Sequence, residues 1–105
     1  MDVNMKIYSA FLMRQVERYV EKLPPAIKAG IWADITAIEH GDFQSAYTKK
    51  LKGQIRELIV KDFRLLFFIS RHTIYFTSIF RKQSAKTPRQ EIERAERLYK
   101  ENQQQ

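Results

Sequence analysis

Hydrophobic residues in the first half of the chain recur at the spacing of two amphipathic helices. Ser9 can cap the first helix, and Pro24 and Pro25 separate it from the second, since proline is tolerated in a first helical turn. The second helix ends at His40 and Gly41. The two apolar stripes consist of Leu12, Val16, Val20 and Leu23, and of Ile27, Ile31, Ile35 and Ile38. With the β-prone residues 3–8 in front, the pattern predicts a strand and a helical hairpin.

The second half of the chain has the pattern of a sheet. Residues 54–60, 63–70 and 73–81 are rich in β-branched, aromatic and leucine side chains. Two dipeptides, Lys61-Asp62 and Arg71-His72, separate these segments, which predicts an antiparallel meander. Pro88 then begins a last helix over 89–100. The predicted order is β-α-α-β-β-β-α, an α+β fold with a small antiparallel-rich sheet, a helical hairpin on one face and a C-terminal helix on that same face.

Alternation along the strands separates the two faces of this sheet. If both turns have two residues, position 64 lies opposite positions 59 and 79. The face under the helices then holds Leu58, Val60, Phe63, Leu65, Phe67, Ile69, Ile74, Phe76 and Phe80. The other face holds Ile55, Glu57, Ile59, Arg64, Leu66, Phe68, Tyr75, Thr77, Ile79 and Arg81. This mixed face, with two arginines at one end, predicts a concave surface that binds an anion. A bulge at Lys61-Asp62 would bring Arg56 onto it in place of Glu57.

Composition limits the class of protein. A chain of 105 residues predicts one domain, spanning 1–105, and 44% hydrophobic residues exclude disorder. The absence of cysteine excludes disulfides and suits a reducing compartment. The longest apolar run, 65–69, is too short for a membrane span, and the N-terminus lacks the pattern of a signal peptide. We therefore expect a soluble, cytoplasmic protein with no membrane partner.

Charge is concentrated in one half of the chain. Residues 1–48 carry a net charge of −1, with five Lys/Arg against six Asp/Glu, whereas residues 49–105 carry +8, with fourteen against six. This asymmetry favours a polyanionic partner, although basicity can also serve solubility alone. Alternative interpretations stay open for single residues: Arg64 can pair with Glu57 or Asp62, and the lysines at 49, 50 and 52 can belong to a solvated loop.

The sequence lacks the residue patterns of several common kinds of functional site. His40 and His72 lie at a helix end and in a turn, without cysteines or clustered carboxylates to complete a metal site. The three glycines form no phosphate-binding loop, and no Ser/His/Asp arrangement is evident. We therefore expect neither a metal nor a cofactor.

Two segments, "LKGQIRELIVKDFRLLFFI" and "IFRKQSAKTPRQEIERA", resemble the RelE/HigB toxin superfamily, in particular its phage-derived HigB-like branch. The resemblance covers residues 50–100 well and the N-terminal half by layout. It implies a RelE-like fold and the toxin of a type II toxin–antitoxin pair, an endoribonuclease that cleaves mRNA on the ribosome and inhibits translation. It also implies a helix-turn-helix antitoxin, the ribosome and mRNA as partners.

The resemblance also indicates site residues. Family arginines map onto Arg64 and Arg81, next to Lys82; with Arg56 these are the candidate catalytic residues. The candidate RNA-binding residues are Lys50, Lys52, Lys86 and Arg89. The family's alternating lysines fall where this chain reads Arg56-Glu57-Leu58, and its helix tyrosine falls near Ile92, so the proton-transfer groups stay open among Arg56, Lys82 and Glu57. Two alternatives remain: a ParE-like inhibitor of DNA gyrase and a basic nucleic-acid-binding module.

Overall fold

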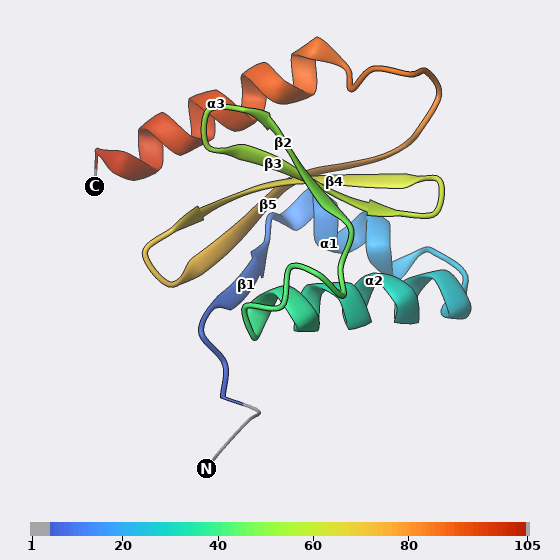
Figure 1. The fold of residues 1–105 in the computed structure, drawn as a ribbon. Helices are drawn as coiled ribbons and strands as arrows, with labels where there is room; N and C mark the ends of the chain where they lie inside the picture. Colours follow the sequence, from blue (N-terminus) through green and yellow to red (C-terminus); the bar gives the residue numbers. More distant parts are fainter. Residues whose placement is uncertain (1–4, 105) are drawn as a thin grey trace.

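A five-stranded sheet separates a pair of helices from a single helix in the computed structural model, which describes residues 5–104 (Figure 1). The elements are β1 (Ser9–Leu12), α1 (Arg14–Glu21), α2 (Pro25–Glu39), β2 (Thr48–Lys52), β3 (Ile55–Val60), β4 (Phe63–Ser70), β5 (Thr73–Arg81) and α3 (Arg89–Gln103). The strand order is β1-β5-β4-β3-β2, with β1 parallel to β5 and the other neighbours antiparallel. The α+β class and the element order are confirmed, with one strand added. None of these helices is long and apolar enough to cross a membrane.

The first strand and helix start later than predicted. The predicted strand at 3–8 lies partly outside the described residues, and positions 5–8 are not a strand. Ser9, expected to cap a helix, instead begins β1, and α1 starts at Arg14. The cause is tertiary pairing, because β1 covers the otherwise open edge of β5 and Ala10 donates its N–H to the Glu39 carboxylate at 2.9 Å. A local capping signal does not outweigh these bonds.

The lysines at 49, 50 and 52 belong to a strand that the sequence pattern does not predict. β2 forms the outer edge of the sheet and pairs antiparallel with β3, with a register shift between Lys50 and Lys52. A lysine-rich strand at an edge discourages pairing with further chains. The loop interpretation of these lysines is therefore wrong.

Helices cover both faces of the sheet, in contrast to the predicted single face. The helical hairpin of α1 and α2 packs on one face, on a core that includes Leu58, Leu65 and Phe67 (Figure 1). α3 packs on the opposite face, where Ala95 meets a smaller core of Ile55, Leu66 and Phe68. This second face is mixed only toward one end, and its apolar part needs a cover of its own.

The strand register agrees with the prediction for β3 and β4 but differs for β5. Both two-residue turns are confirmed, and Ile59 lies opposite Arg64. Thr77 is an extra residue on β5, since Leu66 pairs with Ser78 and Phe67 with Phe76. This bulge shifts the end of β5 by one position, so Arg64 lies opposite Phe80 and not Ile79. The predicted placement of Arg64 and Arg81 on one face is therefore wrong, as are the faces predicted for Ile79 and Phe80.

Candidate functional site

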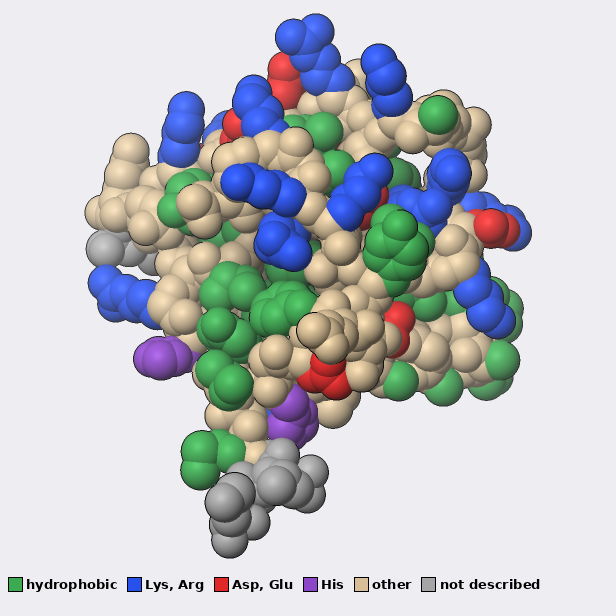
Figure 2. Space-filling model, viewed as in Figure 1, with side chains coloured by type: hydrophobic (Ala, Val, Ile, Leu, Met, Phe, Trp, Pro, Cys, Tyr) green, Lys and Arg blue, Asp and Glu red, His purple; other side chains and the backbone are tan. Residues whose placement is uncertain are grey.

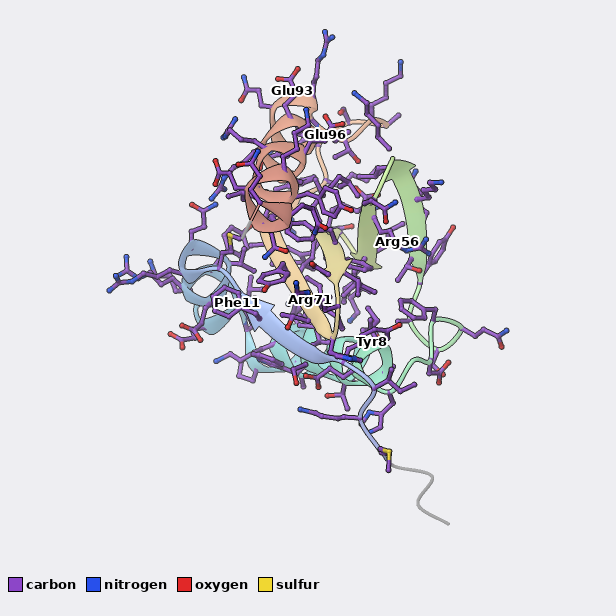
Figure 3. All side chains as sticks on the ribbon, turned by 90° about the vertical axis from the view of Figure 1, so that its left-hand side faces the viewer. Tyr8, Phe11, Arg56, Arg71, Glu93 and Glu96 are labelled. Atoms are coloured by element: carbon purple, nitrogen blue, oxygen red, sulfur yellow. The ribbon has the colours of Figure 1, made fainter. Side chains whose placement is uncertain are left out.

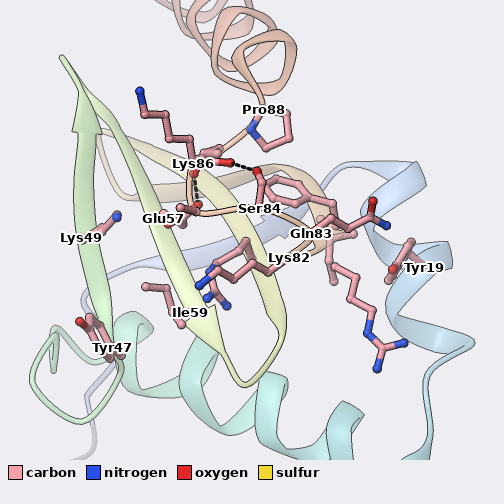
Figure 4. A pocket seen from close by; sticks show the side chains of 16 residues that line it. Tyr19, Tyr47, Lys49, Glu57, Ile59, Lys82, Gln83, Ser84, Lys86 and Pro88 are labelled. Carbon is pink, nitrogen blue, oxygen red and sulfur yellow. Dashed lines mark hydrogen bonds between the residues drawn. The ribbon is translucent and has the colours of Figure 1, made fainter.

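A pocket of about 600 Å³ opens where the ends of the central strands meet the 82–88 loop, which connects β5 to α3 (Figure 4). Its volume lies within the range of about 300–1,000 Å³ that is usual for small-ligand sites. The lining residues come from α1, from strands β2 to β5, and from the segments before β2 and after β5. The pocket is lined by Tyr19, Tyr47, Lys49, Glu57, Ile59, Arg64, Ile79, Phe80 and residues 81–88.

A buried carboxylate ties the loop to the sheet. Glu57 on β3 is only 2% exposed, yet it lines the pocket. The Thr87 hydroxyl donates to Glu57 Oε2 at 2.6 Å, a bond drawn in Figure 4. At the other end of the loop, the Lys82 N–H donates to the Asp62 carbonyl at 2.6 Å. The loop is thus anchored at both ends, which fixes where its backbone places Lys82 and Lys86.

Arg64 is oriented by the turn between β3 and β4. Its Nη1 donates to the carbonyls of Lys61 at 2.8 Å and Phe63 at 3.0 Å. The predicted alternative, an ion pair with Glu57 or Asp62, is not formed. Both of these bonds use Nη1, and the side chain is only half buried. The N–H groups of the other guanidinium nitrogens can therefore donate to an anion in the pocket.

Arg81 reaches the same pocket from the other face of β5. Its guanidinium lies 5.7 Å from the centre of the Phe63 ring, and Nη2 lies 3.7 Å from Asp62 Oδ2. Both charged side chains are more than half exposed, so the ion pair contributes little stability. The bulge separates Arg64 and Arg81 in the register, but the pocket brings them together again.

The lining of the pocket is strongly cationic. Five Lys or Arg side chains line it, against one carboxylate, that of Glu57. The five are Lys49, Arg64, Arg81, Lys82 and Lys86. In the view of Figure 2, Lys and Arg side chains gather over α3, β2 and the loop and are sparser over α2. On this face of the molecule, the basic half of the sequence forms the more basic part of the surface.

Four predicted site residues do not line this pocket. Arg56 lies on the face of the hairpin helices, where it donates to Thr48 Oγ1 at 3.2 Å and lies 5.8 Å from the centre of the Phe43 ring (Figure 3). Lys50 is its cross-strand partner. The other two are engaged near α3: Lys52 pairs with Glu96 at 3.4 Å and Arg89 with Glu93 at 3.4 Å.

Among the lining residues that were not predicted as site residues, three have side chains suited to contact a nucleotide. They are Lys49, which the sequence placed in a possible solvated loop, and Tyr47 and Tyr19, which it did not indicate. Tyr47 is 68% exposed, and the sequence signal that points to it is an aromatic residue two positions before a lysine pair. Tyr19 carries no such signal, because its place in the pocket depends on the packing of α1 against Phe63.

The lining suits an anion better than a cation. Within residues 5–104, no group of three or more His, Cys, Asp or Glu side chains is placed to hold a metal ion. The pocket instead offers guanidinium forks and lysine ammonium groups, which suit phosphate oxygens. Glu57 supplies a carboxylate able to accept a proton. The arrangement can bind a phosphodiester and stabilise charge that develops on it.

Comparison with known proteins indicates a family and a fold. Residues 18–100 match the family described as Phage derived protein Gp49-like (DUF891). None of the curated proteins matches the chain. Among solved structures, the chain is similar to an archaeal RelE-RelB complex from Pyrococcus horikoshii OT3, with a TM-score of 0.62 and 18% identity over 75% of this chain and 99% of that one.

Two further structures show the same architecture. The RelB-RelE antitoxin-toxin complex from Methanococcus jannaschii gives a TM-score of 0.58 and 16% identity, over 68% of this chain and 88% of that one. The toxin-antitoxin complex RelBE2 from Mycobacterium tuberculosis gives 0.52 and 20%, over 71% and 98%. At these identities the similarity establishes a common fold. Together with the family match, it confirms the resemblance seen in the sequence.

Proposed function

Because the chain belongs to the Gp49-like family of phage-derived proteins and has the fold of RelE toxins, we propose that it is the toxin of a toxin–antitoxin pair and that it cleaves mRNA on the ribosome. The observation that carries this proposal is the cationic pocket, in which Arg64 is held by two backbone carbonyls beside a buried carboxylate. Translation is then inhibited by loss of the message.

The proposed reaction uses the 2′-hydroxyl of the RNA as its nucleophile, which restricts the substrate to RNA. The 2′-oxygen bonds to the adjacent phosphorus and the bond from phosphorus to the 5′-oxygen breaks, which leaves a 2′,3′-cyclic phosphate and a 5′-hydroxyl. Negative charge develops on the phosphoryl oxygens during this step. Arg64 and Arg81 stabilise that charge in a site fixed before the reaction begins, and each well-placed donor contributes about 3 kcal/mol.

The placement of the side chains narrows the choice of proton-transfer groups. The reaction needs one group to accept the proton of the 2′-hydroxyl and another to donate a proton to the leaving 5′-oxygen. Glu57 is the carboxylate of the pocket, and Lys82 is a cation on its rim. We assign them as acceptor and donor. Arg56 faces the hairpin helices, so it has no part in the proposed mechanism.

The test is mRNA cleavage in a translating extract, read by primer extension. The wild-type protein should cut translated transcripts, and Arg64→Ala should reduce cleavage at least about 100-fold, the typical effect of losing one preorganised donor. Arg97 and Lys100 are two exposed cations of α3 that lie outside the pocket. They serve as controls and are called the α3 control pair. Arg97→Ala should keep full activity. Uncut transcripts with the wild-type protein would refute the proposal, and inhibition of DNA supercoiling by gyrase would favour the ParE-like alternative.

The proposed partner in the cell is a cognate helix-turn-helix antitoxin that blocks the pocket or its approach with an acidic segment. The net charge of +8 on residues 49–105 supplies long-range attraction. Association of the two proteins should therefore slow as ionic strength rises, because salt screens the attraction. Stopped-flow association rates between low and physiological salt measure this effect, and rates that stay constant would argue against an electrostatic partner site.

A further inference from the structure

Two aromatic side chains stand on opposite walls of the cationic pocket. Tyr47, in the segment between α2 and β2, is 68% exposed, although its carbonyl is held by the Ile59 N–H at 2.9 Å. Tyr19 extends from α1 and is 36% exposed, and its ring and that of Phe63 form a T-shaped pair with centroids 6.2 Å apart. In Figure 4 the two rings lie on either side, with Lys82 between them. Both rings therefore keep exposed surface on elements whose backbone is ordered by hydrogen bonds.

The pocket also has an apolar component that phosphate recognition alone does not require. Ile59 and Ile79 line it together with Phe80, among the cations. Phosphate groups are bound by charged forks and N–H groups, whereas flat aromatic bases are bound by stacking on rings and by apolar contact. A lining that combines cations with two tyrosines and half-buried apolar groups is therefore suited to unpaired nucleotides, whose phosphates and bases both need partners.

We propose that Tyr47 and Tyr19 stack on two unpaired bases of the RNA, one on each side of the phosphate held by Lys82, Arg64 and Arg81. This inference rests on the proposed function for the identity of the nucleic acid, and it adds that the bound stretch is single-stranded. Tyr47 is the principal stacking residue, because its ring is the more exposed. Tyr19 has a second role in packing against Phe63.

The stacking role can be separated from the electrostatic role by salt dependence. A cation that contacts phosphate contributes to the slope of affinity against salt, whereas a neutral ring contributes affinity without changing the slope. The probe is a fluorescein-labelled single-stranded hexanucleotide RNA with 2′-O-methyl groups, which block cleavage. Anisotropy titrations at several salt concentrations compare wild type with Tyr47→Ala, Tyr47→Phe and Lys49→Gln. Trp32→Ala is the control, since Trp32 is an exposed aromatic outside the pocket.

Tyr47→Ala should weaken binding about 5- to 150-fold at an unchanged salt slope, the usual range for one stacked base. Tyr47→Phe should stay within about twofold, Lys49→Gln should flatten the slope, and Trp32→Ala should change neither. Tyr19→Ala should also bind more weakly than wild type. Thermal unfolding first establishes that this variant is folded. Wild type should bind the single strand more tightly than a duplex of the same sequence.

The inference is overturned if Tyr47→Ala binds as tightly as wild type, if its salt slope falls as it does in Lys49→Gln, or if wild type does not bind the single strand or does not prefer it to the duplex. These outcomes are independent of cleavage. A protein that shows Tyr47-dependent stacking but leaves translated mRNA intact would keep the stacking site and refute the nuclease. If Tyr47→Ala cleaves mRNA and binds RNA as well as wild type does, the nuclease proposal stands and the stacking site is refuted.

Discussion

Replacing Thr87 by Val tests whether the bond between the loop and the buried carboxylate holds the pocket in shape. Valine has nearly the volume of threonine but lacks the hydroxyl that donates to Glu57 Oε2 at 2.6 Å. Glu57 is 2% exposed, so in the variant a buried carboxylate loses a short hydrogen bond. The change therefore affects a contact of known geometry without opening a cavity.

The size of the effect follows from the burial of the two partners. A hydrogen bond to a charged group contributes about 1.5–3 kcal/mol to stability. Thr87 is only half buried, which allows water to replace part of the lost donor, so we take the lower value of about 1.5 kcal/mol. For a domain of this size, each kcal/mol lowers Tm by about 4–8 °C, which gives an expected decrease of about 6–12 °C.

Thermal unfolding followed by circular dichroism measures the stability change, and primer extension on translated mRNA measures the activity change. Thr87→Val should reduce cleavage more than its loss of stability explains at a temperature where it is fully folded, because Lys82 and Lys86 lose their fixed positions. Thr87→Ser keeps the hydroxyl and should restore most of both quantities. Glu57→Gln can still accept the Thr87 hydrogen bond but is a poor proton acceptor, so it should stay folded and lose cleavage.

Two results would refute this reasoning. An unchanged Tm in Thr87→Val would mean that the bond contributes nothing measurable to the fold. A loss in Thr87→Ser equal to that in Thr87→Val would mean that the methyl group or the local backbone matters, and the hydroxyl does not. Full cleavage by Glu57→Gln would separately remove Glu57 as the proton acceptor.

Two further predictions follow from the charges. Changing Lys82 and Lys86 to Gln should weaken ribosome binding and lower the dependence of affinity on salt by about one to two phosphate contacts. The same change in the α3 control pair should leave the salt dependence unaltered. An equal decrease in the two double variants would argue against specific contacts. The pKa of the Asp42 carboxyl is lowered mainly by the hydrogen bond from the Ser45 side chain. The carboxylate therefore orders this turn above the unfolded pKa of 3.8, and this effect is lost as pH falls through the lower folded pKa. Protection of the Ser45 amide against hydrogen exchange, relative to an unstructured peptide, should report the loss. A Ser45 amide that is unprotected near neutral pH would contradict the prediction.

The elements that sequence analysis predicted correctly are those specified by neighbours along the chain. The two meander turns, the double proline between the helices and the start of α3 all depend on local residue types. β1 is different, because its parallel pairing with β5 joins Ser9 to Thr73 and is visible only after the chain has folded. β2 was missed because three lysines hide the apolar alternation that identifies a strand.

The candidate site divides in the same way. The strand alternation and the family resemblance indicated Arg64, Arg81, Lys82 and Lys86, all of which line the pocket. They did not indicate the bulge at Thr77, because one extra residue leaves no mark in an alternating pattern but reverses the face of every position after it. The tyrosines of the walls come from α1 and from the segment before β2, so their convergence depends on tertiary structure.

The loop where β5 ends and α3 begins carries positive charge that few acidic side chains balance. Two cations that flank the pocket without lining it have acidic partners: Lys52 pairs with Glu96 and Arg89 with Glu93. Within residues 5–104, Lys82 and Lys86 lie within 4 Å of no acid, and Arg81 has only a weak, exposed pair with Asp62. The pocket's own carboxylate, Glu57, is engaged by a neutral hydroxyl. Unbalanced like charges that are held in place by an anchored loop repel one another, and a bound polyanion relieves that repulsion. If the proposed function is correct, RNA or an acidic segment of the antitoxin in the pocket relieves this repulsion and stabilises the loop.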